Sequence, residues 1–295
     1  MVYALGESLL DIIVSSMDDV VIRPGGAMLN TSISLGRSQI EVWLITELGD
    51  DDTSKLITSF LQDNNVKTGY ISQYKNNNTS LALAFLDDKK KPKYTFIKKY
   101  PDERRFANQP NFTKNDILLF GSLYSIDKKI RKQLSLLISS ANTNKSLIIY
   151  DPNIRNAHHL EDEELMNSII ENIEISNIIK GSDEDFTNIF GNSNTEYQLE
   201  EIRKINKEAL IIITKGADGI IANINEKQIE LASIKTNIVS TIGAGDAFNA
   251  GIIKAIVSLD LRSNLEIYNS LETILQSGLE FSSQVCSSMD NYINP

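Results

Sequence analysis

Near its C-terminal end the chain reads Val239-Ser-Thr-Ile-Gly-Ala-Gly-Asp-Ala-Phe-Asn-Ala-Gly251. Gly243, Ala244 and Gly245 carry almost no side chain, so their backbone N–H groups can approach a ligand closely. The residues that follow suit a buried helix, and a helix N-terminus favours phosphate or another anion. Asp246 would repel that anion unless it acts on a neighbouring group. The stretch alone fits two interpretations of Asp246 equally: a general base that faces an alcohol, or an acid that caps or begins the helix.

Composition excludes several classes of protein. The 295 residues suffice for one large domain or two small ones, and 41% hydrophobic with 23% charged residues is ordinary for a soluble globular protein. The net charge of -10 argues against a nucleic-acid-binding protein. No apolar run approaches the ~20 residues of a membrane span, and the N-terminus lacks the features of a signal peptide. The lone Cys286 suits a reducing compartment, so we expect a cytoplasmic protein with no membrane partner. The adjacent His158 and His159 disfavour a zinc site or a Ser-His-Asp triad.

From about residue 116 the pattern becomes regular. Apolar strands that end in polar or glycine residues alternate with helical segments, which predicts an α/β fold with a parallel sheet covered on both faces. In such sheets ligands bind at the carboxyl ends of the strands. The predicted strands are 117–120, 147–150, 178–179 and 210–214, and the predicted helices are 128–141, 163–173 and 196–208. A late hairpin over 219–232 and a last helix over about 264–286 complete this part.

The first third of the chain has a different character. A short strand at Val2–Leu5 precedes a hairpin over residues 11–23, and β-type runs return between about 70 and 106. These strands could form a small accessory sheet. Pro24-Gly25-Gly26 opens a helix that runs to about Ser38. The glycine pair permits close approach to a ligand, but taken by itself it favours a simple chain reversal. No linker divides the chain, so we expect one domain over 1–295.

Two nucleotide-binding motifs are missing. The sequence has no Gly-x4-Gly-Lys-[Ser/Thr], which excludes a P-loop NTPase. The Gly243-x-Gly245 pair continues to Phe248 instead of a third small residue, and it follows the predicted sheet instead of opening it. A Rossmann dehydrogenase is therefore a poor fit.

Two stretches together resemble the signatures of the PfkB (ribokinase-like) sugar kinase family. The first runs from Pro24-Gly25-Gly26 through Asn30 and Leu35-Gly36 to Leu48-Gly49-Asp50-Asp51, and the second from Thr241 through Gly243-Ala244-Gly245-Asp246 to Ala250-Gly251. The resemblance covers nearly the whole chain. It also includes Gly6-Glu7, Asp11, Asp151-Pro152-Asn153, Arg155 and Thr214-Lys215-Gly216 with Gly219.

This resemblance implies a fold and an activity. The expected fold is a ribokinase-like, parallel-sheet, three-layer α/β domain with a small β-sheet lid, whose strands lie at about 11–23 and 70–106. The expected activity is ATP-dependent phosphorylation of a primary hydroxyl of a sugar or related molecule, with Mg²⁺ held largely by phosphate and water. Members often form homodimers through the lid, so we expect a homodimer as well. The small-molecule partners would be the sugar and ATP.

The resemblance also implies roles for individual residues. Asp246 would be the base that takes the proton of the acceptor hydroxyl, which suits a group with an unperturbed pKa of ~3.9. The N–H groups of Gly243, Ala244 and Gly245 would form the anion hole for the phosphoryl group. The sugar hydroxyls would be bound by Asp11, Gly25, Gly26 and Asn30. The nucleotide would lie beside Lys180, Ser182, Asp185, Thr214, Gly216 and Gly219, and no residue is assigned directly to the metal.

Several positions depart from the family pattern or leave a choice open. Ser182 and Asp185 stand where the family has an Asn-x-x-Glu motif that affects Mg²⁺ and phosphate. Ser240 replaces an aspartate that binds the monovalent cation in potassium-activated members, which puts potassium dependence in doubt. Arg155, in Asp-Pro-Asn-x-Arg, resembles fructokinase-like members in which a basic residue approaches the sugar; a surface arginine paired with Glu161 or Glu163 fits as well.

Three functions remain open at this point. A fructokinase-like sugar kinase leads, on the two signatures and Arg155. Another acceptor, such as ribose, a nucleoside or 2-keto-3-deoxygluconate, is the alternative within the same chemistry. A non-catalytic sugar- or nucleotide-binding protein is the alternative from another class, although a pure binding protein does not need Asp246.

Overall fold

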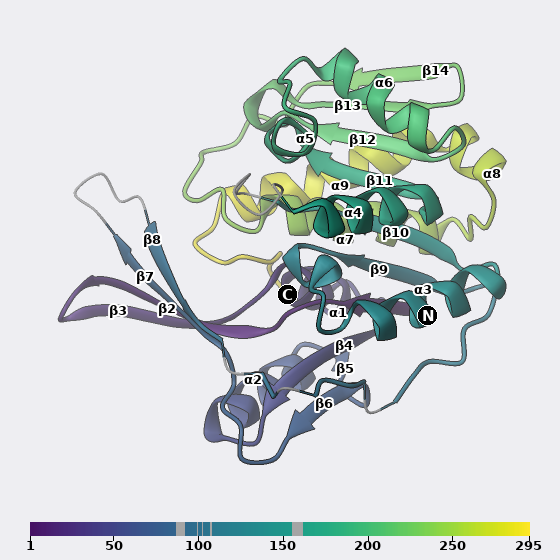
Figure 1. Ribbon diagram of the computed structural model, residues 1–295. Helices are drawn as coiled ribbons and strands as arrows, with labels where there is room; N and C mark the ends of the chain where they lie inside the picture. Colours follow the sequence, from purple (N-terminus) through teal and green to yellow (C-terminus); the bar gives the residue numbers. More distant parts are fainter. Residues whose placement is uncertain (87–91, 99, 102, 107, 155–161) are drawn as a thin grey trace.

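The computed structural model describes residues 1–86, 92–98, 100–101, 103–106, 108–154 and 162–295 (Figure 1). Within these ranges a large, mostly parallel sheet forms the centre of the molecule. Its strands follow the order β14-β13-β12-β11-β10-β9-β1-β4-β5, and β6 also pairs with β4. These strands are β1 (Val2–Leu5), β4 (Val42–Gly49), β5 (Val66–Lys67), β6 (Ile71–Tyr74), β9 (Ile117–Gly121), β10 (Leu147–Asp151), β11 (Ile178–Ser182), β12 (Leu210–Thr214), β13 (Ile220–Ile224) and β14 (Lys227–Leu231).

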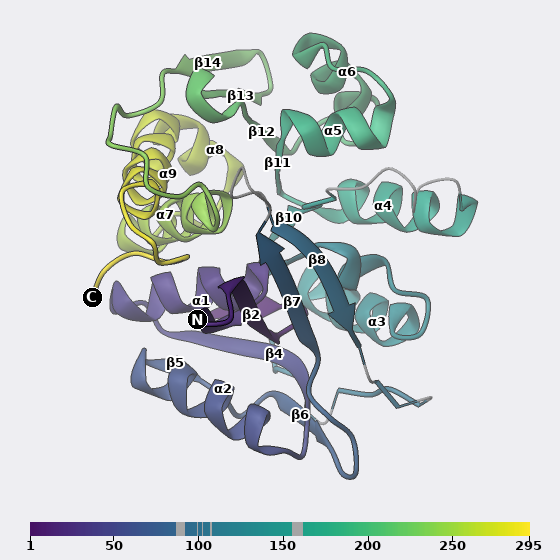
Figure 2. The ribbon, with the colours of Figure 1, turned by 90° about the vertical axis from the view of Figure 1, so that its left-hand side faces the viewer.

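The parallel strands are apolar throughout because both of their faces are buried. In β1, Val2 and Ala4 enter one hydrophobic core while Tyr3 and Leu5 enter the other. Figure 2 shows the resulting three layers, with helices on each side of the sheet. The helices on one side are α1 (Ala27–Arg37), α2 (Asp52–Asp63), α7 (Ala244–Ser258), α8 (Asn264–Asn269) and α9 (Leu271–Cys286). The helices on the other side are α3 (Arg131–Thr143), α4 (Glu163–Ile175), α5 (Asp183–Phe190) and α6 (Thr195–Ile205). The described residues also include the short 3₁₀ helices η1 (Leu123–Ile126) and η3 (Gly216–Asp218).

A second, smaller sheet projects from this body (Figure 1). Its strand order is β3-β2-β7-β8, formed by β2 (Leu9–Ser16), β3 (Asp19–Gly25), β7 (Leu81–Leu86) and β8 (Pro92–Ile97). Strands β2 and β3 are the antiparallel hairpin expected from the sequence, and β7 lies parallel to β2. Three strands lie in the range 70–106. Of these, β7 and β8 belong to the small sheet, whereas β6 pairs with β4 of the large sheet.

The fold is the three-layer α/β arrangement with a small accessory sheet that the sequence predicts, with two local differences. The predicted last helix is two helices, because α8 ends at Asn269 and α9 begins at Leu271. Helix α5 was not predicted, and it begins directly where β11 ends, at Ser182. The late hairpin is present as β13 and β14 at the edge of the large sheet.

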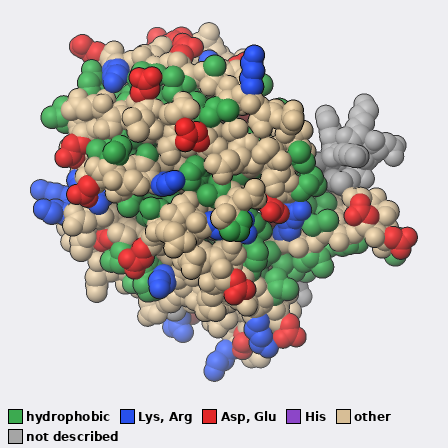
Figure 3. Space-filling view, turned by 180° about the vertical axis from the view of Figure 1, so that it is seen from behind, with side chains coloured by type: hydrophobic (Ala, Val, Ile, Leu, Met, Phe, Trp, Pro, Cys, Tyr) green, Lys and Arg blue, Asp and Glu red, His purple; other side chains and the backbone are tan. Residues whose placement is uncertain are grey.

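Two further observations concern other classes of protein. Within the described ranges, no helix combines the length and apolar character that crossing a membrane requires. Acidic and basic side chains are intermingled on the face seen in Figure 3, with no large basic area there.

Candidate active site

A cavity of about 930 Å³ opens at the carboxyl ends of β10, β11 and β12, beside the start of α7. Its size lies within the usual range for ligand pockets, roughly 300–1,000 Å³. Residues predicted from distant parts of the sequence meet in its wall. These are Lys180, Ser182, Asp185, Thr214, Gly216, Gly219, Gly243, Ala244, Gly245 and Asp246.

Helix α7 begins at the glycine turn, with Gly243 as its N-cap. Gly243 has a φ of 82°, and a Cβ atom there would lie 2.3 Å from the carbonyl oxygen of Asn291. Only glycine fits this position without strain. Asp246 lies in the first turn of α7 and is not its N-cap, so the structure excludes a capping role and retains the interpretation as a first-turn acid beside that as a general base. The Ala244 N–H donates a long hydrogen bond of 3.3 Å to the carbonyl oxygen of Thr241.

Asp246 is fixed by helix α1. Its Oδ2 accepts a 2.8 Å hydrogen bond from Asn30 Nδ2, and its carbonyl oxygen accepts a 3.0 Å bond from Thr31 Oγ1. The carboxylate is almost completely buried, with 5% of the residue exposed. A buried carboxylate held by an amide donor keeps one orientation. The side chain therefore has a defined position at the wall of the cavity.

The other residues predicted to bind the sugar lie around the start of α1. Gly26 is the N-cap of α1, at a φ of 124°, and faces the carbonyl oxygen of Glu7. A Cβ atom on Gly25 would lie 2.0 Å from Asp11 Oδ2, so the Asp11 carboxylate lies directly over Gly25. The fold thus brings Asp11, Gly25, Gly26 and Asn30 together around the start of α1, and Asn30 links this group to Asp246. None of the four is among the residues that line the 930 Å³ cavity. Arg155 lies outside the described residues.

A buried ion pair lies under the glycine turn. Lys180 Nζ is 3.0 Å from Asp151 Oδ2 and donates a 3.2 Å hydrogen bond to the carbonyl oxygen of Gly245. Asn249 Nδ2 donates a 2.6 Å bond to the same Asp151 oxygen. Burial raises the pKa of the Asp151 carboxyl, and this effect outweighs the opposing influence of Lys180. Asp151 and Asn249 were quoted within longer sequence motifs, but neither residue was given a role; the available signal was the position of Asp151 at the end of a buried strand.

Ser182 and Asp185 have a local structural role as well as a place in the cavity. They form a reciprocal capping box at the start of α5, in which Asp185 Oδ2 accepts from the Ser182 N–H at 2.8 Å and from Ser182 Oγ at 2.7 Å. Such a box satisfies two backbone donors of the first turn. The spacing of Ser182 and Asp185, which suggested a phosphate motif, is therefore also the spacing of a capping box at the start of a helix.

A cluster of charged and aromatic side chains beside Gly26 was missed by the sequence reasoning. Glu7 accepts hydrogen bonds of 2.8 Å from Lys98 Nζ and from the Tyr100 hydroxyl. The guanidinium of Arg104 lies 3.9 Å from the centre of the Tyr100 ring and makes a buried ion pair with Glu47. These residues come from three distant segments, so no local pattern could reveal the cluster.

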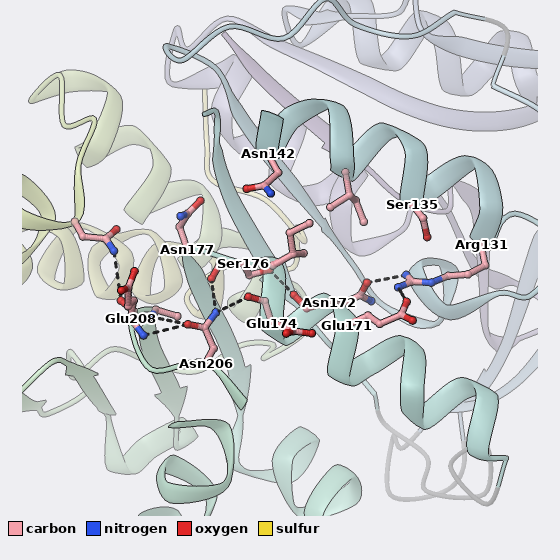
Figure 4. Close-up of a pocket in the computed structure, with 14 residues that line it drawn as sticks. Arg131, Ser135, Asn142, Glu171, Asn172, Glu174, Ser176, Asn177, Asn206 and Glu208 are labelled. Carbon is pink, nitrogen blue, oxygen red and sulfur yellow. Dashed lines mark hydrogen bonds and ion pairs between the residues drawn. The ribbon is translucent and has the colours of Figure 1, made fainter. Parts of the chain in front are cut away.

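Figure 4 shows a second cavity, of about 550 Å³, on the side of α3 and α4 near the amino ends of β11 and β12. Three of its amide side chains, those of Asn177, Asn206 and Asn264, are hydrogen-bonded to backbone groups. Asn206 Nδ2 donates to the carbonyl oxygens of Ile173, Glu174 and Ser176. This cavity contains none of the residues predicted from the sequence, and it lies at the opposite edge of the sheet from the first.

Comparison with known proteins identifies the family of this chain. The model of the pfkB family carbohydrate kinases matches residues 3–294. The chain belongs to this family. The kinase is 26% identical to a fructokinase from Vibrio alginolyticus over 259 residues, which cover 86% of this chain and 83% of that protein.

Two solved structures share the fold of this kinase. A fructokinase from Vibrio cholerae O395 with fructose, ADP and calcium bound matches with a TM-score of 0.85 at 20% identity, over 98% of this chain and 94% of that one. An aminoimidazole riboside kinase from Salmonella enterica, in complex with aminoimidazole riboside and an ATP analogue, matches with a TM-score of 0.84 at 19% identity. That match covers 98% of this chain and 94% of the other. These structures show the ribokinase-like fold, while membership among the carbohydrate kinases rests on the family match.

Proposed function

We propose that this carbohydrate kinase transfers the γ-phosphoryl group of ATP to a primary hydroxyl of a sugar, with fructose as the acceptor. The observation that carries the proposal is the 2.8 Å hydrogen bond from Asn30 to Asp246. It joins the residues proposed to bind the sugar to the proposed base, which lies in the wall of the cavity proposed for the nucleotide.

The cavity suits a nucleoside triphosphate. Its wall includes the apolar residues Ile234, Ile238 and Ile242, which would suit a planar base. The start of α7 also lies in the wall, and there the N–H groups of Gly243, Ala244 and Gly245 would bind the transferring phosphoryl group. The bond from the Ala244 N–H to Thr241 is long enough for an anion to replace it.

The reaction needs a base, positioning and charge neutralisation. The acceptor oxygen forms a bond to the γ-phosphorus while the bond from that phosphorus to the β,γ-bridging oxygen breaks, and ADP leaves. The hydroxyl proton passes to the carboxylate of Asp246. Asn30 holds this carboxylate, so the base meets the acceptor in one geometry.

Mg²⁺ would shield the phosphate charges when MgATP binds. Among the described residues no group of three or more His, Cys, Asp or Glu side chains could hold a metal ion. The carboxylates of Asp183, Glu184 and Asp185 line the cavity. This donor set fits a hydrated Mg²⁺ that is bound mainly by phosphate oxygens and water.

Fructose is favoured by the fructokinases among the similar proteins, and a nucleoside remains the second candidate because of the similarity to aminoimidazole riboside kinase. A coupled ADP-release assay with MgATP decides between them. The panel contains fructose, ribose, glucose, 2-keto-3-deoxygluconate and adenosine, in sodium and in potassium buffers. We expect fructose to give the highest kcat/KM. A clear preference for adenosine or ribose would replace fructose, and no ADP above background would favour a non-catalytic binding protein.

The small sheet supports the proposal of a homodimer. Ile12 and Val14 of β2 pair with Ile22 and Val20 of β3, so these four side chains share one face of the sheet. On the same face, Val14 pairs with Phe85 of β7. Val20, Ile22 and Phe85 are 45%, 56% and 52% exposed, an unusual amount for large apolar side chains on adjacent strands.

The apolar face points away from the acceptor residues. Side chains alternate along a strand, so Asp11 lies on the opposite face of β2 from Ile12. A second copy could therefore cover the apolar face without blocking the residues proposed to bind the sugar. Figure 3 shows hydrophobic side chains along this projecting sheet.

A further inference from the structure

The ion pair between Lys180 and Asp151 lies at the inner wall of the cavity. Asp151 is the last residue of β10, and Lys180 is in the middle of the adjacent strand β11. Their side chains are 1% and 5% exposed. Removing two charges from water costs several kcal/mol per ion in real proteins, so a pair like this persists only with good geometry and further hydrogen bonds.

Asp151 receives two donors on a single oxygen. Lys180 Nζ and Asn249 Nδ2 both bind Asp151 Oδ2, at 3.0 and 2.6 Å. The other oxygen, Oδ1, is buried and has no hydrogen-bond partner, and the same holds for Asn249 Oδ1. A buried polar atom without a partner is costly, so folding stability alone does not account for this arrangement.

The position of the ammonium points to the phosphates. Lys180 Nζ has two partners in the structure, Asp151 Oδ2 and the Gly245 carbonyl oxygen. An ammonium has three N–H donors, so one remains for a ligand. A Cβ atom on Gly245 would lie only 3.1 Å from Nζ, which places the charge directly against the glycine turn. Lysine is a compact charge on a flexible stem, and it needs a neighbour to hold it in one place.

We propose that Asp151 is a positioning residue, which together with Asn249 holds the Lys180 ammonium against Gly245 so that it binds the terminal phosphates of a nucleoside triphosphate. This inference rests on the proposed function for the identity of the ligand. In this arrangement Asp151, whose side chain is 1% exposed, would act on the nucleotide only through the ammonium. Its contribution to binding therefore passes entirely through Lys180.

A double-mutant cycle tests this dependence. Binding of ATP and of adenosine is measured by calorimetry, without any acceptor, for the wild type, Asp151→Asn, Lys180→Met and the double variant. We expect each single substitution to weaken ATP binding by about tenfold or more, the usual scale for a charged hydrogen bond, and to leave adenosine binding unchanged. The double variant should bind ATP as Lys180→Met does, because Asp151 has no effect once the ammonium is gone.

Two further variants keep the result interpretable. Asp116→Asn is the matched control: Asp116 is also a buried carboxylate paired with an ammonium, that of Met1, but it lies at the amino end of β9. It should alter stability without altering ATP affinity. If Asp151→Asn does not fold, Asn249→Ala removes the second donor to Asp151 and should weaken ATP binding only while Lys180 is present.

The outcomes separate this inference from the proposed function. Losses from Asp151→Asn and Lys180→Met that multiply in the double variant would overturn the positioning role, as would unchanged ATP affinity in Asp151→Asn. Equal losses for ATP and adenosine would also overturn it, since they indicate general damage to the cavity. Turnover on the acceptor panel is measured separately. A protein that shows the expected double-mutant cycle but no turnover would refute the proposed kinase reaction and leave the positioning role of Asp151 standing.

Discussion

Asn30 and Asp246 are separated by 216 positions in the chain, yet their side chains share a 2.8 Å hydrogen bond in the protein interior. The bond ties the first turns of α1 to the first turn of α7. Each helix begins at a glycine with positive φ, Gly26 and Gly243. The two glycine turns therefore meet at one carboxylate.

Asp246→Asn tests the proposed base. The new amide can still accept the hydrogen bond from Asn30, so the fold should be retained. Without a proton acceptor, kcat should fall by about 10²–10⁴-fold, while the Kd of ATP changes little. Steady-state kinetics with the preferred acceptor and calorimetry with ATP measure the two quantities. A variant with turnover close to that of the wild type would show that another group takes the proton.

The apolar face of the small sheet predicts a change of oligomeric state. Phe85→Ser should shift the protein from dimer to monomer in sedimentation velocity, because it removes a large apolar side chain from the proposed interface. Phe96→Ser is the matched control, since Phe96 is 55% exposed against 52% for Phe85 but lies on the opposite face. If both variants behave as the wild type does, or if the wild type is a monomer, the proposed interface is wrong.

The ion pair of Arg104 and Glu47 predicts a large effect on stability. Both side chains are essentially unexposed, and the Nη2–Oε2 distance is 2.5 Å. Arg104→Met would leave the Glu47 carboxylate buried without its counter-charge and should lower the free energy of unfolding by about 3–5 kcal/mol. Urea titration measures this change, and adding Glu47→Gln should restore part of it.

Arg262→Met is the control for that measurement. Arg262 pairs with Asp260, whose side chain is 83% exposed, and such surface pairs contribute about 0–1 kcal/mol. If Arg104→Met and Arg262→Met lowered the free energy of unfolding by the same amount, burial of the ion pair would not explain the effect of Arg104→Met.

The thiol of Cys286 offers a probe of the nucleotide cavity. Cys286 lines the cavity and is partly buried, and burial raises the pKa of its thiol. Only the thiolate reacts with iodoacetamide, so at pH 7.5 alkylation should be slower than for an exposed cysteine peptide, and it should accelerate as the pH rises. Saturating ATP should slow it further at every pH. Intact mass spectrometry reads the result without ambiguity, since the chain has one cysteine. Equal rates with and without ATP would place the nucleotide elsewhere.

Local sequence patterns were sufficient for much of the molecule. The apolar runs of β9, β10 and β12 and the glycine turn before α7 are encoded within a few residues, because strand periodicity and turn chemistry are local properties. The signatures around Gly25-Gly26 and Gly243–Asp246 indicated the family, which the match over residues 3–294 shows. Of these two signatures, the second contributes Gly243, Ala244, Gly245 and Asp246 to the wall of the large cavity.

Other features depended on the tertiary structure. The order of strands in the sheet brings Asp151 of β10 next to Lys180 of β11, and no pattern near either residue encodes that neighbour. The same is true of Asn30 with Asp246 and of Arg104 with Glu47. Ser182 and Asp185 show that a local pattern can also be ambiguous, since the same spacing fits both a phosphate motif and a capping box. The sequence by itself determined the chemistry of each turn, because that chemistry depends on neighbouring residues. The partners that hold the side chains of a turn come from distant parts of the chain. They were decided only by the tertiary structure, since long-range packing and strand register select them.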